Sequence, residues 1–146
     1  MKVRRPFALR RHCLSVIATA LMGLGAAASP SVAQTSADDA TLKLGQRVFL
    51  LCQACHSVEE GGMNKIGPNL FGVFGRAAGG KSDFAYYSDA LKKSGITWSD
   101  TTLDQWLTNP SAMVPGTKMS FRGIDNPDNR KAVIAYLKQQ TSAAKK

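Results

Sequence analysis

The segment Cys52-Gln53-Ala54-Cys55-His56 holds the three side chains of this sequence best placed to do chemistry together. Two cysteines three positions apart, followed directly by a histidine, form the spacing that attaches a haem covalently, because each thiol can add across one vinyl group. The histidine on the same turn then faces the iron and supplies an axial nitrogen. We therefore interpret Cys52, Cys55 and His56 as a haem-attachment site.

Two other classes of site also use a Cys-x-x-Cys pair. A redox dithiol of the thioredoxin type follows a strand and precedes a long helix, and no βαβ pattern surrounds this motif. A structural zinc site needs two further Cys or His ligands. The only other candidates are His12 and Cys13, in a segment that we expect to be removed. The motif and the number of Cys and His residues together favour haem.

The first 33 residues have the pattern of a cleavable secretory signal. Five basic residues lie among the first 11, an apolar stretch runs from Cys13 to Ala28, and Ser31-Val32-Ala33 offers a small-x-small cleavage site. The apolar stretch is shorter than the about 20 strongly apolar residues of a spanning helix. We therefore expect cleavage and export to the periplasm, with an uncleaved membrane tether as the alternative. Residues 34–146 would remain as one small domain.

Much of the positive charge of the chain belongs to this expected signal. The whole sequence carries 19 Lys and Arg against 10 Asp and Glu, a net charge of +9. The signal contains five of the basic residues and none of the acidic ones, which leaves 14 against 10, or +4. A modest charge with interspersed signs gives no basis for nucleic-acid binding, and we expect none.

A helix before the attachment motif must position it. Apolar residues at helical spacing predict a first helix from Thr41 to Cys52, with Asp38 or Asp39 as its cap. The polar residues 34–39 that precede it are expected to fray.

A second long helix is expected at the C-terminal end, where Asn126-Pro127 provides a cap and a first-turn proline. Glycine inside a helix lowers the stability of that helix by about 1 kcal/mol relative to alanine. We interpret Gly45 in the first helix as a notch over which the C-terminal helix crosses, with Tyr136 and Phe49 as partners. The apolar side of the C-terminal helix carries Val133, Ile134, Tyr136 and Leu137.

Glycines and prolines interrupt the chain between these ends, and two short helices fit among the breaks. One is expected from about Ser88 to Ser94, with Asp89 paired to Lys93 and Gly95 as its stop. The other is expected from about Thr101 to Thr108. No strand-like alternation is present, so the predicted class is all-α. Because the chain is rich in loops, it has too few helices to bury a core alone, and a large apolar cofactor would complete that core.

The second axial ligand is expected to be a methionine, because no other histidine follows the expected signal. Met63 lies seven residues after His56, too near to reach the opposite face of the haem. Met113 and Met119 both lie far enough along the chain to return over the ring. Met119 ends the stiff turn Pro115-Gly116-Thr117-Lys118-Met119. We favour Met119, with Met113 or an open sixth position as the alternatives.

Further motifs occur in an order that resembles the class I c-type cytochromes of the mitochondrial and alphaproteobacterial kind. They are Gly67-Pro68-Asn69-Leu70, Gly72-Val73-Phe74-Gly75-Arg76, Gly95-Ile96-Thr97-Trp98, the turn ending at Met119 with Phe121 after it, and Ile134-Ala135-Tyr136-Leu137. The resemblance covers about residues 42–139 and implies a cytochrome c domain over 34–146. It implies a small all-α single-domain fold with crossing N- and C-terminal helices, in which short helices and loops surround one covalently bound haem c.

The resemblance also implies roles for residues around the haem. The carbonyl at Pro68 would accept the free ring N–H of His56 and fix its tautomer. The sequence departs from the family at Leu91, where an asparagine is usual, and in a first helix one residue shorter before Cys52. The other implied members of the site are Arg76, Tyr87 and Trp98 at a buried propionate, Thr117 at the propionates and the methionine loop, and Phe121 at the haem edge.

The implied function is one-electron transfer through an exposed haem edge rather than catalysis. Docking onto acidic surfaces of redox proteins would be steered by Lys118, and the weaker candidates are Lys65, Lys81, Lys92 and Lys93. Such partners include a quinol–cytochrome c oxidoreductase, an oxidase, a reaction centre or a dehydrogenase, and we expect a monomer. Two alternatives stay open: a gas-binding or peroxidatic haem protein, and a subunit dedicated to one dehydrogenase.

Overall fold

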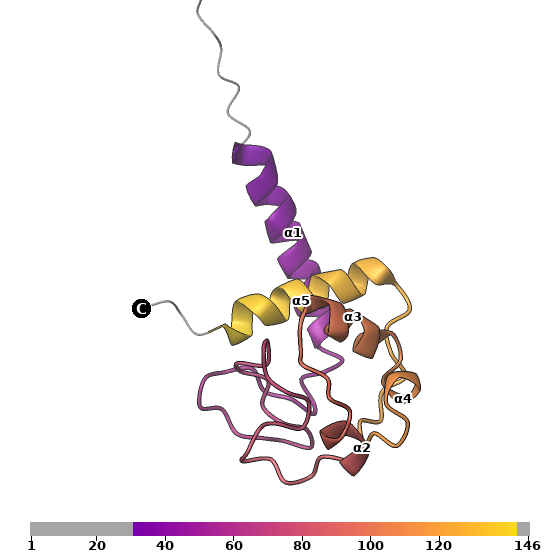
Figure 1. Cartoon of the computed structure of the whole chain (residues 1–146). Helices are drawn as coiled ribbons and strands as arrows, with labels where there is room; N and C mark the ends of the chain where they lie inside the picture. The colour runs from indigo at the N-terminus through magenta and orange to yellow at the C-terminus, as the bar shows by residue number, and fades with distance from the viewer. Residues whose placement is uncertain (1–30, 143–146) are drawn as a thin grey trace, which may run out of the picture.

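The computed structural model describes residues 31–142, so most of the expected signal, with His12 and Cys13, lies outside the described residues. Five helices follow one another in this part of the chain (Figure 1): α1 Ser31–Phe49, α2 Asp89–Lys92, α3 Asp100–Thr108, α4 Pro110–Met113 and α5 Pro127–Thr141. The β interaction seen within residues 31–142 is one isolated antiparallel bridge, between Ala77 and Thr97. The expected all-α class is confirmed. None of the helices described is long and apolar enough to cross a membrane.

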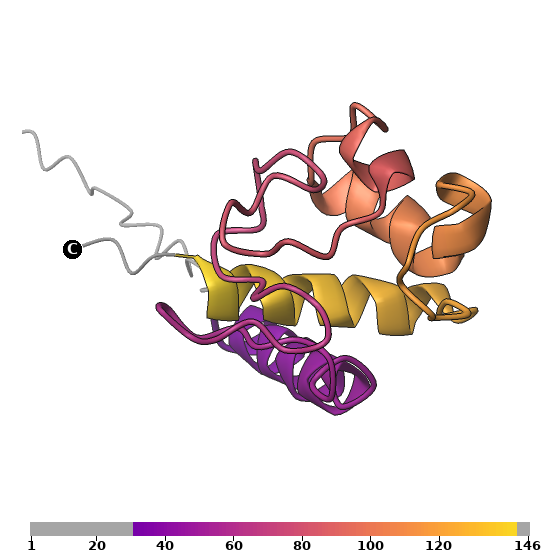
Figure 2. The ribbon, with the colours of Figure 1, turned by 90° about the horizontal axis from the view of Figure 1, so that it is seen from below.

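Helices α1 and α5 cross and pack closely near the C-terminal end of α1 (Figures 1 and 2). A side-chain carbon at Gly45 would overlap the backbone carbonyl oxygen of Ala132 and would lie 2.7 Å from Cβ of Tyr136. Beside this contact, the ring centroids of Phe49 and Tyr136 are 5.5 Å apart. The crossing over a glycine notch is therefore confirmed.

The start of α1 differs from the expected helix. It begins at Ser31 rather than at Thr41, so the residues expected to fray are helical, and neither Asp38 nor Asp39 is an N-terminal cap. The physical reason is the composition of residues 31–40, which include three alanines and neither proline nor glycine. Alanine is the best helix former, and nothing in this stretch ends a helix that runs into it.

The end of α1 also differs, because the helix stops at Phe49 and tight turns carry the chain through the attachment motif. The amide of Cys52 donates to the carbonyl of Phe49 (2.8 Å), and the amide of His56 donates to the carbonyl of Cys52 (2.9 Å). These turns orient the two cysteines and the histidine from the end of α1, where Val48 and Phe49 are buried.

Helix α2 is shorter than expected. The side chain of Ser88 caps it by accepting from the amide of Leu91 (3.1 Å). The expected pair between Asp89 and Lys93 is wrong: Asp89 lies 3.3 Å from Nζ of Lys92 instead. Lys93 is the C-terminal cap of α2, and its amide donates to the carbonyl of Asp89 (2.9 Å), but the side chain of Asp89 pairs with that of Lys92.

Helices α3 and α5 agree with the expected positions, and each has a side-chain cap. Ser99 and Thr102 form a reciprocal capping box at α3, in which each side chain accepts from the other residue's amide. Asn126 caps α5 by accepting from two amides of the first turn. The short helix α4, which Asn109 caps, was not predicted. Both α3 and α5 supply core side chains, which include Leu103, Trp106, Leu107, Val133, Ile134 and Leu137.

Candidate functional site

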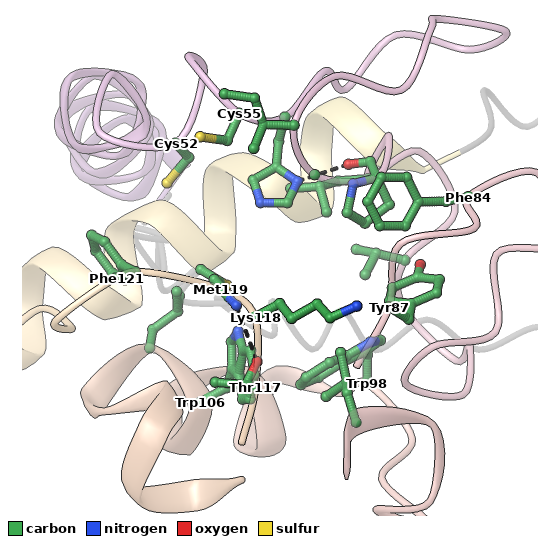
Figure 3. Close-up of a pocket in the computed structure, with 18 of the residues that line it drawn as sticks. Cys52, Cys55, Phe84, Tyr87, Trp98, Trp106, Thr117, Lys118, Met119 and Phe121 are labelled. Atoms are coloured by element: carbon green, nitrogen blue, oxygen red, sulfur yellow. Dashed lines mark hydrogen bonds between the residues drawn. The ribbon is translucent and has the colours of Figure 1, made fainter. Parts of the chain in front are cut away.

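A cavity of about 290 Å³ lies between α5, α3 and the loops that follow α1 (Figure 3). Every side chain that the sequence placed at the site lines this one cavity: Cys52, Cys55, His56, Pro68, Arg76, Tyr87, Trp98, Thr117, Met119 and Phe121. The turn of Cys52 and Cys55 and the segment of Thr117, Met119 and Phe121 lie on different sides of it (Figure 3). The fold therefore brings together residues that are widely separated in the sequence.

The ring of His56 is held by its neighbours. Nδ1 lies 2.7 Å from the carbonyl oxygen of Pro68. Because a carbonyl only accepts, Nδ1 carries the proton, which leaves Nε2 with a free lone pair. Burial lowers the pKa of His56, the hydrogen bond to Pro68 raises it, and the charge of Lys65 lowers it again. The neutral ring is thus the favoured form, and that is the form that binds a metal.

Asn69 holds the loop that carries Pro68, and sequence reasoning gave it no role of its own. The residue is 2% exposed. Its Nδ2 donates to Oγ of Ser57 (2.8 Å) and to two backbone carbonyls in the 59–62 turn (3.0 Å each), while Oδ1 accepts from the amide of Phe71 (2.7 Å). One buried amide side chain therefore satisfies four groups of this loop and fixes the carbonyl that orients the histidine.

The two cysteines are free thiols at the edge of the cavity (Figure 3), and both are half-buried. Burial, together with the neighbouring charge of Cys55, raises the pKa of Cys52 to about 11. In the folded chain the Cys52 thiol is therefore protonated at neutral pH. A protonated Cys52 is a weak nucleophile, because the thiolate is the reactive form of cysteine. No group of three or more His, Cys, Asp or Glu that could hold a metal ion occurs in the described residues.

The three candidate methionines have different surroundings. Met63 is 84% exposed, and Met113 packs against the core without lining the cavity. Met119 is half-buried and lines the cavity. Its amide donates to Oγ1 of Thr117 (3.3 Å), and its carbonyl accepts from the amide of Phe121 (3.0 Å). Met119 is thus the one of the three whose sulfur can meet a group bound in the cavity.

The polar part of the lining suits an anionic group. The only charged side chains on the cavity wall, among the residues described, are Arg76 and Lys118. The guanidinium of Arg76 donates to the carbonyls of Phe71 (3.0 Å) and Asn69 (3.3 Å). Burial raises the pKa of Tyr87, so its hydroxyl stays a donor. A lining with cationic and neutral donors and no carboxylate fits the propionates of a haem.

The apolar walls contain several residues that the sequence reasoning did not assign. Trp106 is 5% exposed and packs edge-on against Trp98 with centroids 5.4 Å apart. The helical spacing of α3 was the signal that could have located Trp106. Leu91 is 8% exposed and also lines the cavity, so the unusual apolar residue does lie at the site. The other newly found wall residues are Leu70, Val73, Phe84, Leu103, Leu107, Val133 and Leu137.

Comparison with known proteins decides the family. The sequence model of the cytochrome c family, described as "Cytochrome c", matches residues 42–141. The chain belongs to the cytochrome c family. This cytochrome is 54% identical to cytochrome c2 iso-2 of Magnetospirillum molischianum over 90 residues, which is 62% of this chain and 91% of that one. It is 43% identical to cytochrome c2 of Blastochloris viridis over 119 residues, or 82% of this chain and 88% of that one.

A solved structure agrees with this assignment. Cytochrome cH from Methylobacterium extorquens is 48% identical and superimposes with a TM-score of 0.62, covering 67% of this chain and 97% of that one. Members of this family carry one haem c bound covalently through the two cysteines of a Cys-x-x-Cys-His motif, here Cys52 and Cys55. The described cavity fits this group: it offers two thiols, an imidazole with a free nitrogen, apolar walls and cationic donors. When bound, haem c supplies an iron that gains and loses one electron.

Proposed function

We propose that this cytochrome carries single electrons between redox proteins in the periplasm, with His56 and Met119 as the two axial ligands of its haem. One observation carries the axial pair: the cavity that receives the free Nε2 of His56 also receives Met119, and neither Met63 nor Met113 lines it. Methionine sulfur favours the reduced iron, which suits a carrier with a raised potential. The residues from Gly67 to Asn69 hold one ligand, and Thr117 and Phe121 hold the other.

The residues around these ligands have complementary tasks. Pro68 keeps the proton of His56 on Nδ1. Arg76, Tyr87 and Trp98 would bind a propionate at the polar end of the cavity. The apolar walls exclude water from both axial positions. A rigid site of this kind changes little between oxidation states, so little reorganisation accompanies electron transfer.

Replacement of Met119 by alanine tests the ligand directly. We expect the variant to lose the sulfur-to-ferric-iron charge-transfer absorbance, to show a lower midpoint potential, and to bind imidazole more tightly than the wild type. Absorption spectroscopy and potentiometry of the purified holoprotein measure these changes. Met63→Ala and Met113→Ala remove the same atoms away from the cavity and should keep the wild-type spectrum. An unchanged ferric spectrum in Met119→Ala would show that another group, or none, occupies the sixth position.

The mouth of the cavity is the proposed docking surface. Three exposed apolar side chains line it, Leu51 (63% exposed), Ile66 (80%) and Tyr86 (74%), together with the exposed Lys118. The partner would therefore present an apolar centre and a carboxylate opposite Lys118. Three of the weaker lysine candidates are already engaged: Lys81 with Asp83 (2.7 Å), Lys92 with Asp89 (3.3 Å) and Lys65 with the carbonyl of Gln53 (2.6 Å).

Charge reversal of Lys118 tests this surface. On an electrode coated with a carboxylate-terminated monolayer, Lys118→Glu should lower the interfacial electron-transfer rate about threefold at low ionic strength, because one steering charge is reversed. Lys93→Glu makes the same change in net charge away from the mouth and should have a smaller effect. Equal losses in the two variants would mean that net charge, and not the mouth, governs the approach.

We further propose that residues 1–33 are a signal that is cleaved on export and that 34–146 form the mature domain. The basic start, the apolar stretch and the Ser31-Val32-Ala33 site support this proposal. Intact mass spectrometry of the periplasmic fraction should give a chain that starts near Gln34 with the mass of one added haem. A full-length mass in the membrane fraction would favour a tether instead.

A further inference from the structure

The segment from Met119 to Asp125 is fixed mainly at its far end. The amide of Ile124 donates to the carbonyl of Leu107 in α3 (2.8 Å), and Ile124 is 7% exposed. Gly123 has a φ of +107°, and a side-chain carbon there would overlap the carbonyl oxygen of Thr108. The segment that carries the proposed ligand therefore packs against the C-terminal end of α3. The contact is made by Gly123 and Ile124, four and five residues after Met119.

A single side chain of α5 joins this far end to α3. Nη1 of Arg130 donates to the carbonyls of Ile124 (2.8 Å) and Asp125 (3.1 Å). Nε of the same guanidinium donates to Oδ1 of Asp104 in α3 (2.8 Å). The Arg130 side chain is 12% exposed, against 45% for Asp104. We call this set of contacts the Arg130 bridge.

The Arg130 bridge differs in kind from an ordinary surface ion pair. A guanidinium presents several donors in a fixed plane, so it can hold a carboxylate and two carbonyls in one relative geometry. A lysine in its place would keep the charge without that geometry. Because α3 also supplies Leu103, Trp106 and Leu107 to the cavity wall, the bridge sets the ligand segment relative to the wall itself.

We propose that Arg130, supported by Asp104, is a positioning residue for the Met119 side of the site and controls how readily that side admits a small external ligand. The proposal rests on the proposed role of Met119 as a ligand. When the bridge is intact, the end of the segment at Ile124 cannot move away from α3, and the sulfur stays close to its position. When the bridge is broken, the segment moves more freely and the sulfur is displaced more easily.

The chain contains a matched control for this bridge. Lys138 of α5 lies 2.7 Å from Asp100 of α3, so it forms an ion pair between the same two helices. Both of these side chains are 57% exposed, and among the described residues neither forms a hydrogen bond or an ion pair with the segment from 119 to 125. Asp100→Asn therefore removes an α3–α5 ion pair without touching the ligand segment.

The test compares Arg130→Lys and Asp104→Asn with Asp100→Asn in the ferric holoprotein. Imidazole affinity should rise about tenfold in Arg130→Lys, the effect of losing a hydrogen bond to a charged donor, and by a smaller factor in Asp104→Asn. Hydrogen exchange at the amide of Ile124 should accelerate by a similar factor. Both quantities should stay at the wild-type value in Asp100→Asn. Asp104→Asn keeps Arg130 in place and carries the test if Arg130→Lys folds poorly.

Met119→Ala, measured in parallel, separates the two ways to fail. If Met119→Ala leaves the imidazole affinity unchanged, Met119 is not the ligand and the proposal falls with that assignment. If Met119→Ala raises the affinity while Arg130→Lys and Asp104→Asn change it no more than Asp100→Asn, the ligand assignment stands and the Arg130 bridge has no positioning role.

Discussion

Replacing Gly67 with alanine is expected to prevent His56 from occupying its present position. The added Cβ would overlap Cε1 of the imidazole and would lie 2.8 Å from Nδ1 and 2.9 Å from Nε2. The ring cannot retreat without losing its 2.7 Å hydrogen bond to Pro68, which the buried Asn69 holds in place. Displacement of the proposed ligand has a far larger effect than the strain of one methyl group, so we expect holoprotein yield to fall about tenfold or more.

Haem content per chain and the electronic spectrum of the purified product measure this result. The variant Met63→Ala alters the same loop at a side chain that is 84% exposed and does not line the cavity, and its haem content should match that of the wild type. If Gly67→Ala showed full haem content and the wild-type midpoint potential, the loop could shift to accommodate the added Cβ. The position of the His56 ring would then not require a glycine at position 67.

The second large effect is expected at the helix crossing, from Gly45→Ala. The new Cβ would overlap the carbonyl oxygen of Ala132 and lie 2.7 Å from both its carbonyl carbon and Cβ of Tyr136. Alanine favours the helix by about 1 kcal/mol. Forcing two packed helices apart costs more, because overpacked interiors typically lose about 1–3 kcal/mol and a backbone obstacle cannot rotate away. We expect a net fall of about 2 kcal/mol in the free energy of unfolding.

Denaturant unfolding followed by far-ultraviolet circular dichroism gives this free energy. Gln46→Ala introduces the same side chain one position along α1, at an exposed site, and should leave stability unchanged or slightly raised. If Gly45→Ala had the same free energy of unfolding as Gln46→Ala, α1 and α5 could move apart without loss of stability. The crossing would then not require a glycine at position 45.

The features that could be predicted from the sequence are those set by residues close together in the chain. The motif from Cys52 to His56 is a contiguous chemical signature, and the caps at Ser99 and Asn126 are local hydrogen-bonding choices. The crossing at Gly45 was predictable because glycine inside a helix needs a reason, and a second amphipathic helix was available. Where local signals were weak, the prediction was wrong, as at the start of α1 and in the ion pair of Asp89.

Distant contacts explain what the sequence could not predict. Arg130 reads as an ordinary basic residue in the first part of α5, and only the fold brings it against Asp104, 26 positions earlier. In the sequence, Asn69 is only one residue of a motif. In the fold, its side chain stabilises a loop through hydrogen bonds to four groups. Neither partner set follows from spacing, because both depend on how helices and loops pack in space.

The crossing of α1 and α5 also sets an order of assembly. Val133 and Leu137, on the last helix of the described residues, form part of the cavity wall, so the cavity is incomplete while only the earlier residues have been synthesised. The turn of Cys52 and Cys55 emerges well before that wall exists. In the folded chain, burial raises the pKa of the Cys52 thiol to about 11 and makes it a poor nucleophile. The chain therefore has an early interval in which the Cys52 thiol is less buried than in the folded protein, and the packing of α5 ends that interval.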